Sequence, residues 1–464
     1  MRGAGADRPV VARKPGNAGG AKGTGHPGES GGQPASAERS RTDEPRPKPF
    51  VIDKWAVWEA YRRVKANRGA AGVDEQSVQD FEADLKGNLY KIWNRMSSGT
   101  YFPPPVKAVA IPKGAGGTRM LGVSTVADRV AQTVAAMALE PVVEPVFYPD
   151  SYGYRPGRSA LDAVRVCRQR CWESDWVIDL DLKSFFDTSP HDLLLRAVEH
   201  HLDHDRRWVL LYVQRWLTAP LQDEDGRLVA RDRGSPQGSA ISPLLSIIFL
   251  HHAFDAWMAR TFPDIRFERY CDDVVVHAKT ERQAREVLAA VIARLAECGL
   301  ELNETKTVLV YCKDDRRRGP YGPNRFDFLG YTFRTRSVKG RAGSLFVGFT
   351  PAVSDDAGKR MRRRIRRWRL HLRTNWTLDD LARMVNPVTR GWIHYYGRYR
   401  RSQLYPTLRR IDEYLVRWLM HKYKRFKGSS GRAYAFPGHH QGTPTGTVRS
   451  LAGGGADGWM MGAG

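Results

Sequence analysis

The sequence predicts an α+β fold whose central part has the strand and helix order of a split βαβ, or ferredoxin-like, sheet. Short apolar runs indicate the strands, and an apolar period of 3.6 over residues 281–298 indicates a helix. Thr280 and Gln283 form a capping box before that helix, and Gly299 follows it as a stop signal. The order over residues 177–311 is strand, helices, strand, strand, helix, strand. The predicted strands are residues 177–182, 265–270, 274–276, 300–303 and 308–311.

Length and charge limit the possible classes of protein. The chain has 464 residues and a formal net charge of +24, from 74 Lys and Arg against 50 Asp and Glu. This length predicts two or three domains, and so basic a balance predicts a polyanionic partner. No apolar run approaches the ~20 residues of a membrane span, so we expect no membrane association. The five cysteines form no CxxC pair, which favours a reducing compartment.

The N-terminal part changes character near residue 50. Residues 1–50 are rich in Gly, Pro, Arg and Ser, which predicts a disordered basic tail. Helical periodicity begins at Trp55, and a second helix is predicted over residues 78–96. Further helices are predicted at residues 124–139, 158–171 and from 234–238 to about 258.

A glycine-rich loop lies between two strand-like runs, residues 106–111 and 120–123. Lys113 and Arg119 border this loop, where cations and backbone N–H groups could cradle a triphosphate. The loop matches neither a P-loop nor a dinucleotide fingerprint. An ordinary flexible hairpin loop would have the same composition, so both interpretations stay open.

Two acidic elements carry the clearest chemical signal. Asp272 and Asp273 lie between two apolar runs, at the tip of a predicted hairpin. Alternation over residues 177–182 places Asp179 and Asp181 on one face of a strand. Carboxylates that converge from separate strands are what two-metal phosphoryl transfer requires, although Asp-Asp pairs also occur at many ordinary turns.

The C-terminal part is basic and aromatic. Residues 359–373 contain nine Lys or Arg and no acidic residue on a helical pattern. Interleaved rings favour RNA contact over a merely solvated face, because rings stack on unpaired bases while cations hold the backbone. Residues 151–158 form a second aromatic and basic loop. The candidate RNA-binding residues are Arg155, Arg158, Arg363, Arg366, Arg367, Arg390, Trp392, Tyr395, Tyr396, Arg400 and Arg401.

Two histidine pairs, His200-His201 and His251-His252, lie within helical patterns. Neither pair has a partner at metal-binding spacing along the chain. We interpret all four as ordinary surface or packing residues.

Eight blocks of the sequence, in this order, resemble bacterial group II intron-encoded reverse transcriptase–maturases. Together they cover about residues 55–427, and their order makes the resemblance specific. The family carries Ala more often where this chain has Cys271, and we expect little loss of activity because both side chains are small. The blocks are residues 67–74, 111–123, 151–158, 181–187, 235–243, 270–273, 299–306 and 328–331.

The resemblance implies a right-hand polymerase with fingers and a ferredoxin-like palm, followed by an α-helical thumb and maturase (X) domain. Residues 328–331 resemble the primer grip. The last cysteine is Cys312, so the zinc-binding endonuclease of many relatives is expected to be absent, as in the endonuclease-free lineage. The expected domains are a tail (1–50), N-terminal extension and fingers (51–176), palm (177–335), thumb and maturase domain (336–427) and a low-complexity tail (428–464).

Residue roles also follow from the resemblance. Asp181, Asp272 and Asp273 match the carboxylates that hold two Mg²⁺ ions. Asp179 and Asp187 are interpreted as supporting neighbours of that set. Matches to nucleotide-binding residues are Lys113 and Arg119 at the triphosphate, Phe186 under the sugar, Gln237 beside the incoming nucleotide and Lys306 at the border of the same site.

The implied function is RNA-directed DNA polymerisation, with binding of intron RNA for splicing and for mobility by target-primed reverse transcription. Implied partners are the intron RNA, an RNA template, a DNA primer or target DNA, and deoxynucleoside triphosphates. The implied location is the bacterial cytoplasm, at the nucleoid. Two alternatives stay open: an RNA-binding splicing factor with an inactive polymerase, and a domesticated reverse transcriptase used in defence or repair.

Overall fold

The computed structural model describes residues 48–112, 117–340 and 343–434. Residues 1–47 of the predicted N-terminal tail, Lys113 and residues 435–464 lie outside this description. Among the described helices, none combines the length and the apolar character needed to span a membrane.

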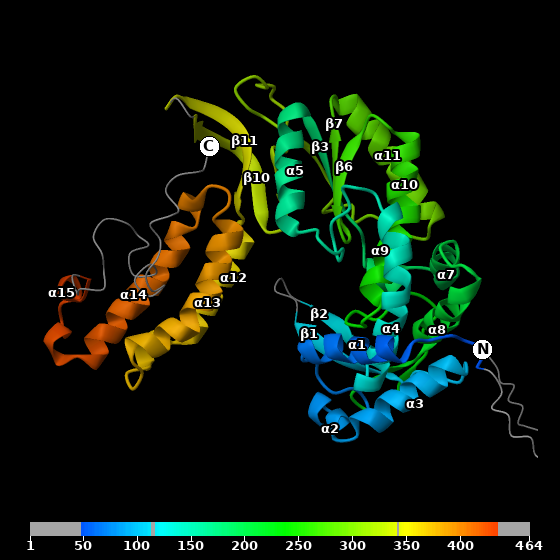
Figure 1. Ribbon diagram of the computed structural model, residues 1–464. Coiled ribbons are helices and arrows are strands. Elements are labelled where there is room, and N and C mark those ends of the chain that lie inside the picture. Colours follow the sequence, from blue (N-terminus) through cyan, green and yellow to red (C-terminus); the bar gives the residue numbers. More distant parts are fainter. Residues whose placement is uncertain (1–47, 113–116, 341–342, 435–464) are drawn as a thin grey trace, which may run out of the picture. The chain divides into compact units, whose positions relative to one another are not determined.

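The central sheet has four antiparallel strands in the order β6-β7-β3-β8 (Figure 1). This is the ferredoxin-like order that the sequence predicts. The predicted strand at residues 300–303 is absent, and only Leu302 forms an isolated bridge to Leu182. The strands are β3 (Trp176–Asp181), β6 (Arg266–Tyr270), β7 (Asp273–Ala278) and β8 (Val308–Tyr311).

Helices cover both faces of this sheet. Helix α11 (Glu281–Glu297) packs on the face that carries Ile178 and Val276. Helix α5 (Ala160–Glu173) packs on the opposite face, which carries Val177 and Val275. Thr280 is the N-cap of α11, since its side chain accepts from the Gln283 backbone. The reciprocal bond of the predicted capping box is not formed, because the Gln283 side chain accepts from the Lys279 N–H instead.

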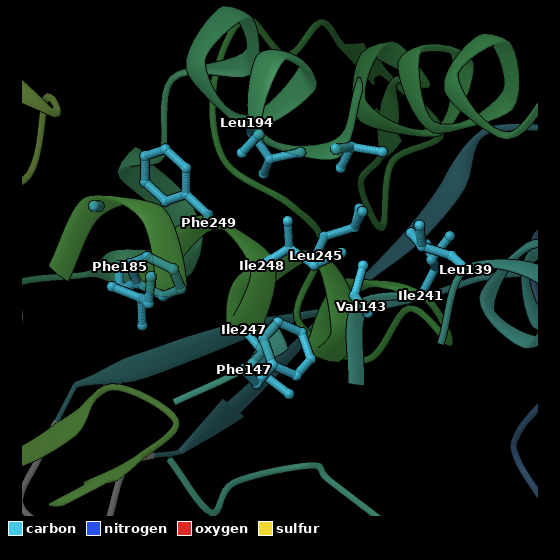
Figure 2. Packing of buried hydrophobic residues seen from close by; sticks show 14 of the residues in the cluster. Leu139, Val143, Phe147, Phe185, Leu194, Ile241, Leu245, Ile247, Ile248 and Phe249 are labelled. Atoms are coloured by element: carbon cyan, nitrogen blue, oxygen red, sulfur yellow. The ribbon is translucent and has the colours of Figure 1, made fainter. Parts of the chain in front are cut away.

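Helix α9 (Ser242–Leu250) lies at the centre of the main hydrophobic core. Figure 2 shows its side chains Leu245, Ile247, Ile248 and Phe249 among those of neighbouring helices. The predicted helix start at 234–238 is wrong, because residues 234–241 form a loop. After α9 the chain continues as a π-helical turn, η3 (His251–Asp255), and helix α10 (Ala256–Thr261).

The N-terminal helices pack under a small four-stranded sheet of order β2-β1-β4-β5. The helix predicted over residues 78–96 is broken at Asp84, whose side chain accepts from the Gly87 backbone and so caps a new helix. These helices are α1 (Lys54–Ala66), α2 (Val78–Ala83), α3 (Leu85–Ser97) and α4 (Val126–Val143). The strands are β1 (Val106–Pro112), β2 (Thr118–Val123), β4 (Leu221–Gln222) and β5 (Leu228–Val229). Between β3 and β4 lie α6 (Phe185–Thr188), α7 (His191–Glu199) and α8 (Arg207–Thr218).

The C-terminal part adds a three-stranded sheet and a helical unit with its own core. The strands are β9 (Arg325–Phe328), β10 (Tyr331–Lys339) and β11 (Leu345–Val353). The helices are α12 (Asp355–Trp368), α13 (Leu378–Tyr396), α14 (Tyr405–Lys422) and α15 (Ser430–Tyr434). Helix α15 lies beyond the predicted domain end at residue 427, and its Ala433 is buried in that core. Short 3-10 turns are η1 (Glu144–Val146), η2 (His204–Arg206), η4 (Leu370–Leu372), η5 (Arg401–Gln403) and η6 (Lys424–Phe426).

Candidate active site and nucleic-acid surface

A tight turn at Cys271 and Asp272 joins β6 to β7 and presents the paired carboxylates. Cys271 has a φ of +58°, in the left-handed region. Gly153 lies against this turn so closely that a Cβ there would be 2.4 Å from the Cys271 nitrogen. Only glycine fits this contact, which explains why the aromatic and basic loop contains Gly153.

Asp181, the last residue of β3, lies directly opposite Asp273, the first residue of β7. Opposed residues of an antiparallel pair have Cα atoms about 4.5–5.5 Å apart, so the two carboxylates share one small region. Burial raises the pKa of Asp273 to about 6, and the charges of Asp272 and Asp181 add to the shift. Burial also raises the pKa of Asp272, while Arg119 and Arg269 oppose that shift.

Lys306 forms an ion pair with one of these acids. Its Nζ lies 3.1 Å from Oδ2 of Asp181. The turn that carries it is fixed to the same strand, because the Asn303 N–H donates to the Asp181 carbonyl at 2.8 Å. The structure therefore brings Lys306 to the acidic residues from a position 125 residues away in the chain.

Asp179 lies on the same strand face as Asp181 but deeper in the fold. Its pKa is raised to about 8, first by burial and then by the charges of Asp273, Asp181 and Asp327. Asp179 is therefore largely protonated near neutral pH. Asp187 is exposed.

A buried ion pair that sequence reasoning missed supports the acidic turn. The guanidinium of Arg269 and the carboxylate of Asp255 are both fully buried and paired, with Nε 2.7 Å from Oδ1. Arg269 also donates from Nη1 to the Cys271 carbonyl at 3.0 Å. Asp255 is the last residue of the π-helical turn η3. No local pattern in the sequence relates this residue to the acidic turn at Cys271 and Asp272.

The predicted nucleotide-binding residues that the structure describes lie on connected segments. Arg119 is exposed on β2 and acts on the pKa of Asp272. The Gln237 carbonyl accepts from the Gly122 N–H of the same strand at 2.7 Å. Two residues earlier, the Ser235 N–H donates to the carbonyl of half-buried Phe186 at 2.7 Å. Backbone bonds thus link β2, the Gln237 loop and the Phe186 turn.

A second buried network anchors the Gln237 loop. Oε1 of Gln132 accepts from the Ser239 hydroxyl at 2.6 Å and from the Ala240 N–H at 2.8 Å. Nε2 of Gln132 donates to Asp128, which also accepts from Trp216. Burial raises the pKa of Asp128 to about 6, although these donors oppose the shift. The signal available in the sequence was the spacing of Asp128 and Gln132, which places both on the apolar face of α4 with Ala135.

Helix α12 has the predicted basic face. It buries Met361 and Ile365, whereas Arg363, Arg366 and Arg367 are exposed. A surface hollow on this helix is lined by Arg360, Arg363, Arg364, Arg367 and Trp368.

Two family models match the chain. Residues 111–333 match the reverse transcriptase (RNA-dependent DNA polymerase) family, and residues 358–434 match the group II intron maturase-specific domain. The chain belongs to the group II intron-encoded reverse transcriptase–maturases. Both catalytic and maturase parts of the predicted family are therefore confirmed, as is the RNA-directed DNA polymerase class.

Curated relatives agree with this family. The chain is 32% identical to protein YkfC of Escherichia coli K12, over 58% of this chain and 82% of that protein. It is 28% identical to the group II intron-encoded protein LtrA of Lactococcus lactis, over 59% of this chain and 44% of LtrA. It is 31% identical to an uncharacterized 91 kDa protein in the cob intron of Schizosaccharomyces pombe, over 44% of this chain. The chain covers 25% of that last protein.

The structure corrects one RNA-binding prediction in the reverse transcriptase part. The Arg155 side chain is 4% exposed and pairs with Glu144 at 2.7 Å. It also donates to the carbonyls of Tyr148 and Ser151. Arg155 therefore holds its own loop and is not available to a phosphate. Arg158, by contrast, is exposed.

The aromatic rings among the predicted RNA-binding residues of the maturase-specific domain also pack within the protein. Tyr395 and Tyr396 lie with ring centres 5.5 and 5.7 Å from Tyr331. The Tyr395 hydroxyl donates to the Leu329 carbonyl at 2.8 Å. Trp392 stacks on Trp368 at 5.7 Å. These three rings join helix α13 to its neighbours, and all three are half-buried, so their contact with RNA stays a prediction.

The remaining cations differ in their surroundings. Arg400 donates to the Ser337 carbonyl of β10, so it ties the segment between α13 and η5 to that strand. Arg390 and Arg401 are exposed. Composition alone could not separate these cases, because each is an arginine in the same basic and aromatic segment.

Proposed function

We propose that this chain copies RNA into DNA from a DNA primer and binds its intron RNA to promote splicing and mobility. The observation that carries the proposal is the juxtaposition of Asp181, Asp272 and Asp273 at adjacent strand ends, where burial and mutual repulsion raise the pKa of two of them. Acids held so close favour either protonation or a bound cation.

The donor set fits a hard divalent ion. Asp181, Asp272 and Asp273 offer only carboxylate oxygens, which Mg²⁺ prefers. We propose that they hold two Mg²⁺ ions, which when bound would favour the ionised primer hydroxyl and offset charge on the pyrophosphate. Lys306 neutralises part of the acidic charge beside Asp181.

The chain's own residues orient the nucleotide in this proposal. Arg119, with Lys113, holds the triphosphate next to the acids. Phe186 lies under the sugar and excludes a 2′-hydroxyl by its bulk. Gln237 borders the base, and its loop is kept in place by the Gln132 hydrogen bonds.

The maturase-specific domain supplies the RNA-binding activity in this proposal. The exposed cations of α12, Arg363, Arg366 and Arg367, meet phosphates of the intron, and Arg158, Arg390 and Arg401 extend the basic surface. We propose residues 336–434 as this domain, with palm at 177–335 and fingers before it. The end at 434 follows the helix α15 that packs on its core.

Primer extension tests the proposal against its alternatives. Purified protein is given an RNA template, a DNA primer and deoxynucleoside triphosphates with Mg²⁺, and splicing is measured with the intron RNA. Extension that is lost in Asp272→Ala supports the proposed site. Splicing without any extension would favour the inactive-polymerase alternative, and extension without an intron flanking the gene would favour the domesticated enzyme.

A further inference from the structure

Four histidines that are far apart in the sequence form one cluster. His200 and His201 follow helix α7, while His251 and His252 begin the π-helical turn η3. Their ring centres lie 4.9 Å apart for His201 and His252 and 5.2 Å apart for His200 with each of these two. The ring of His251 lies 5.2 Å from that of His252. The rings therefore pack on one another, although the two pairs are 51 residues apart in the chain.

The rings of His201 and His252 face each other, with one nitrogen of each at the contact. Nε2 of His201 lies 2.8 Å from Nε2 of His252. One nitrogen donates and the other accepts, so the two imidazoles cannot both be protonated. Burial lowers the pKa of His201 and lowers that of His252 to about 4, with the neighbouring histidines adding to both shifts. Neutral imidazole is the form that binds metal.

We propose that His200, His201 and His252 bind a borderline transition-metal ion of the Zn²⁺ class. Three imidazoles on one tetrahedral Zn²⁺, each with Zn–N of about 2.1 Å, have neighbouring ring centres about 5 Å apart, as the three rings have. The facing nitrogens of His201 and His252 separate by about 0.5 Å to reach tetrahedral ligand spacing. The ligand nitrogens of these three rings do not all lie within 4.8 Å of one another in this structure. The proposal therefore requires the ring of His200, which is exposed at the end of α7, to turn and supply the third nitrogen, with water completing the shell.

This site differs from the proposed Mg²⁺ site in its chemistry. Imidazole selects Zn²⁺, Ni²⁺ or Cu²⁺, whereas carboxylates select Mg²⁺. A second cluster of possible ligands, Cys167, Glu268 and His277, is fully buried. There Arg170 already pairs with Glu268 at 2.8 Å, so a metal ion would lie beside a guanidinium. That guanidinium, which is already paired with Glu268, makes the buried cluster unfavourable for a cation.

An ion at this position would join α7 to η3. The same π-helical turn ends at Asp255, which pairs with Arg269 behind the acidic turn. Binding to the folded state alone raises the melting temperature. We therefore expect Zn²⁺ to stabilise the segment that supports the acidic turn without taking part in its chemistry.

Calorimetric titration of ZnCl₂ into protein without a histidine tag, in excess Mg²⁺, tests the proposal. The expected result is about one bound ion per chain and a higher melting temperature with Zn²⁺. His201→Gln and His252→Gln should each weaken binding at least about tenfold. Co²⁺ bound in place of Zn²⁺ should give the visible absorbance of a tetrahedral site, which both variants lose.

His204→Gln is the matched control, because the His204 side chain is 93% exposed and its ion-pair partner is Asp205. It should bind Zn²⁺ like the parent chain. Melting without metal and primer extension with Mg²⁺ establish that each variant is folded. Undiminished Zn²⁺ binding by a folded His252→Gln chain, or no binding by the parent chain in excess Mg²⁺, would show that the rings form only a hydrogen-bonded pair and would overturn the proposal.

Discussion

Asp181 and Asp273 lie directly opposite each other in the pairing of β3 with β7. The register is fixed by the apolar faces on both sides of the sheet, because Ile178 and Val177 must each stay buried. A shift of one residue would turn Asp181 into the core and expose Leu180. The position of the acids is thus a consequence of core packing.

Replacing Asp272 by Asn should lower the rate of primer extension at least about a hundredfold while the chain stays folded. Burial and like charge raise the pKa of this carboxyl, so the neutral amide relieves repulsion and should leave the melting temperature unchanged or higher. Extension assays and thermal melts measure the two effects. Asp205→Asn, at a side chain 93% exposed, is the control that should keep full activity.

Replacing Asp179 by Asn should keep most of the polymerase activity, in contrast to Asp181→Asn. The raised pKa of Asp179, about 8, makes this carboxyl largely neutral at pH 7, so an amide of the same shape preserves its charge state. Steady-state extension rates of the two variants provide the comparison. Equal losses in both would mean that Asp179 also acts as a charged ligand.

Asp128 should make the fold less stable as pH rises from about 4 to about 6. Its folded-state pKa is raised to about 6, so the folded chain binds the proton more tightly than the unfolded chain does. The free energy of unfolding therefore falls by about 3 kcal/mol across this window and is level above it. Denaturation of the parent chain and Asp128→Asn at several pH values isolates the effect, since only the parent curve should carry this slope.

Removing one partner of the Arg269–Asp255 pair should destabilise the fold by about 3–5 kcal/mol, because a buried charge is left unpaired. Replacing both, as in Arg269→Met with Asp255→Leu, should restore much of the stability. Extension should stay low in the double variant, since the Cys271 carbonyl has lost its donor. Full activity in a stable double variant would argue against a positioning role for Arg269.

Changing Arg363, Arg366 and Arg367 together to Gln should weaken binding of intron RNA and flatten its salt dependence. Loss of three phosphate contacts should reduce the slope of log affinity against log salt by about 2–3. Filter binding over a range of salt concentrations measures this slope. The matched control removes the same charge from three exposed residues, Lys279 before α11 and Arg282 and Arg285 within it, and should leave the slope unchanged.

Much of the fold and of the acidic site follows from local sequence pattern. Alternation in residues 177–182 predicts which way Asp181 faces, and two apolar runs predict the hairpin that carries Asp272. Both predictions depend on neighbours within a few residues, where the period of a strand determines the face. The ferredoxin-like strand order follows from the sequence of elements in the same way.

Contacts between distant segments could not be predicted in this way. The pair of Asp255 with Arg269 depends on a π-helical turn, and the meeting of His201 with His252 spans 51 residues. Tyr395 lies in a segment whose basic and aromatic composition predicts RNA contact, and its ring packs on Tyr331. In each case tertiary packing, which a single sequence does not encode locally, determines what the side chain touches.

Tyr331 and Tyr395 are joined twice, since each hydroxyl donates to a backbone carbonyl on the other's segment, at Tyr395 and Leu329 respectively. The turn before β10 and the end of α13 must consequently move together. If residues 328–331 guide the growing DNA end, as the family resemblance implies, any tilt of α13 on loading the intron also shifts that end. Release of a spliced intron and the start of copying would then be coupled through these two hydroxyl contacts.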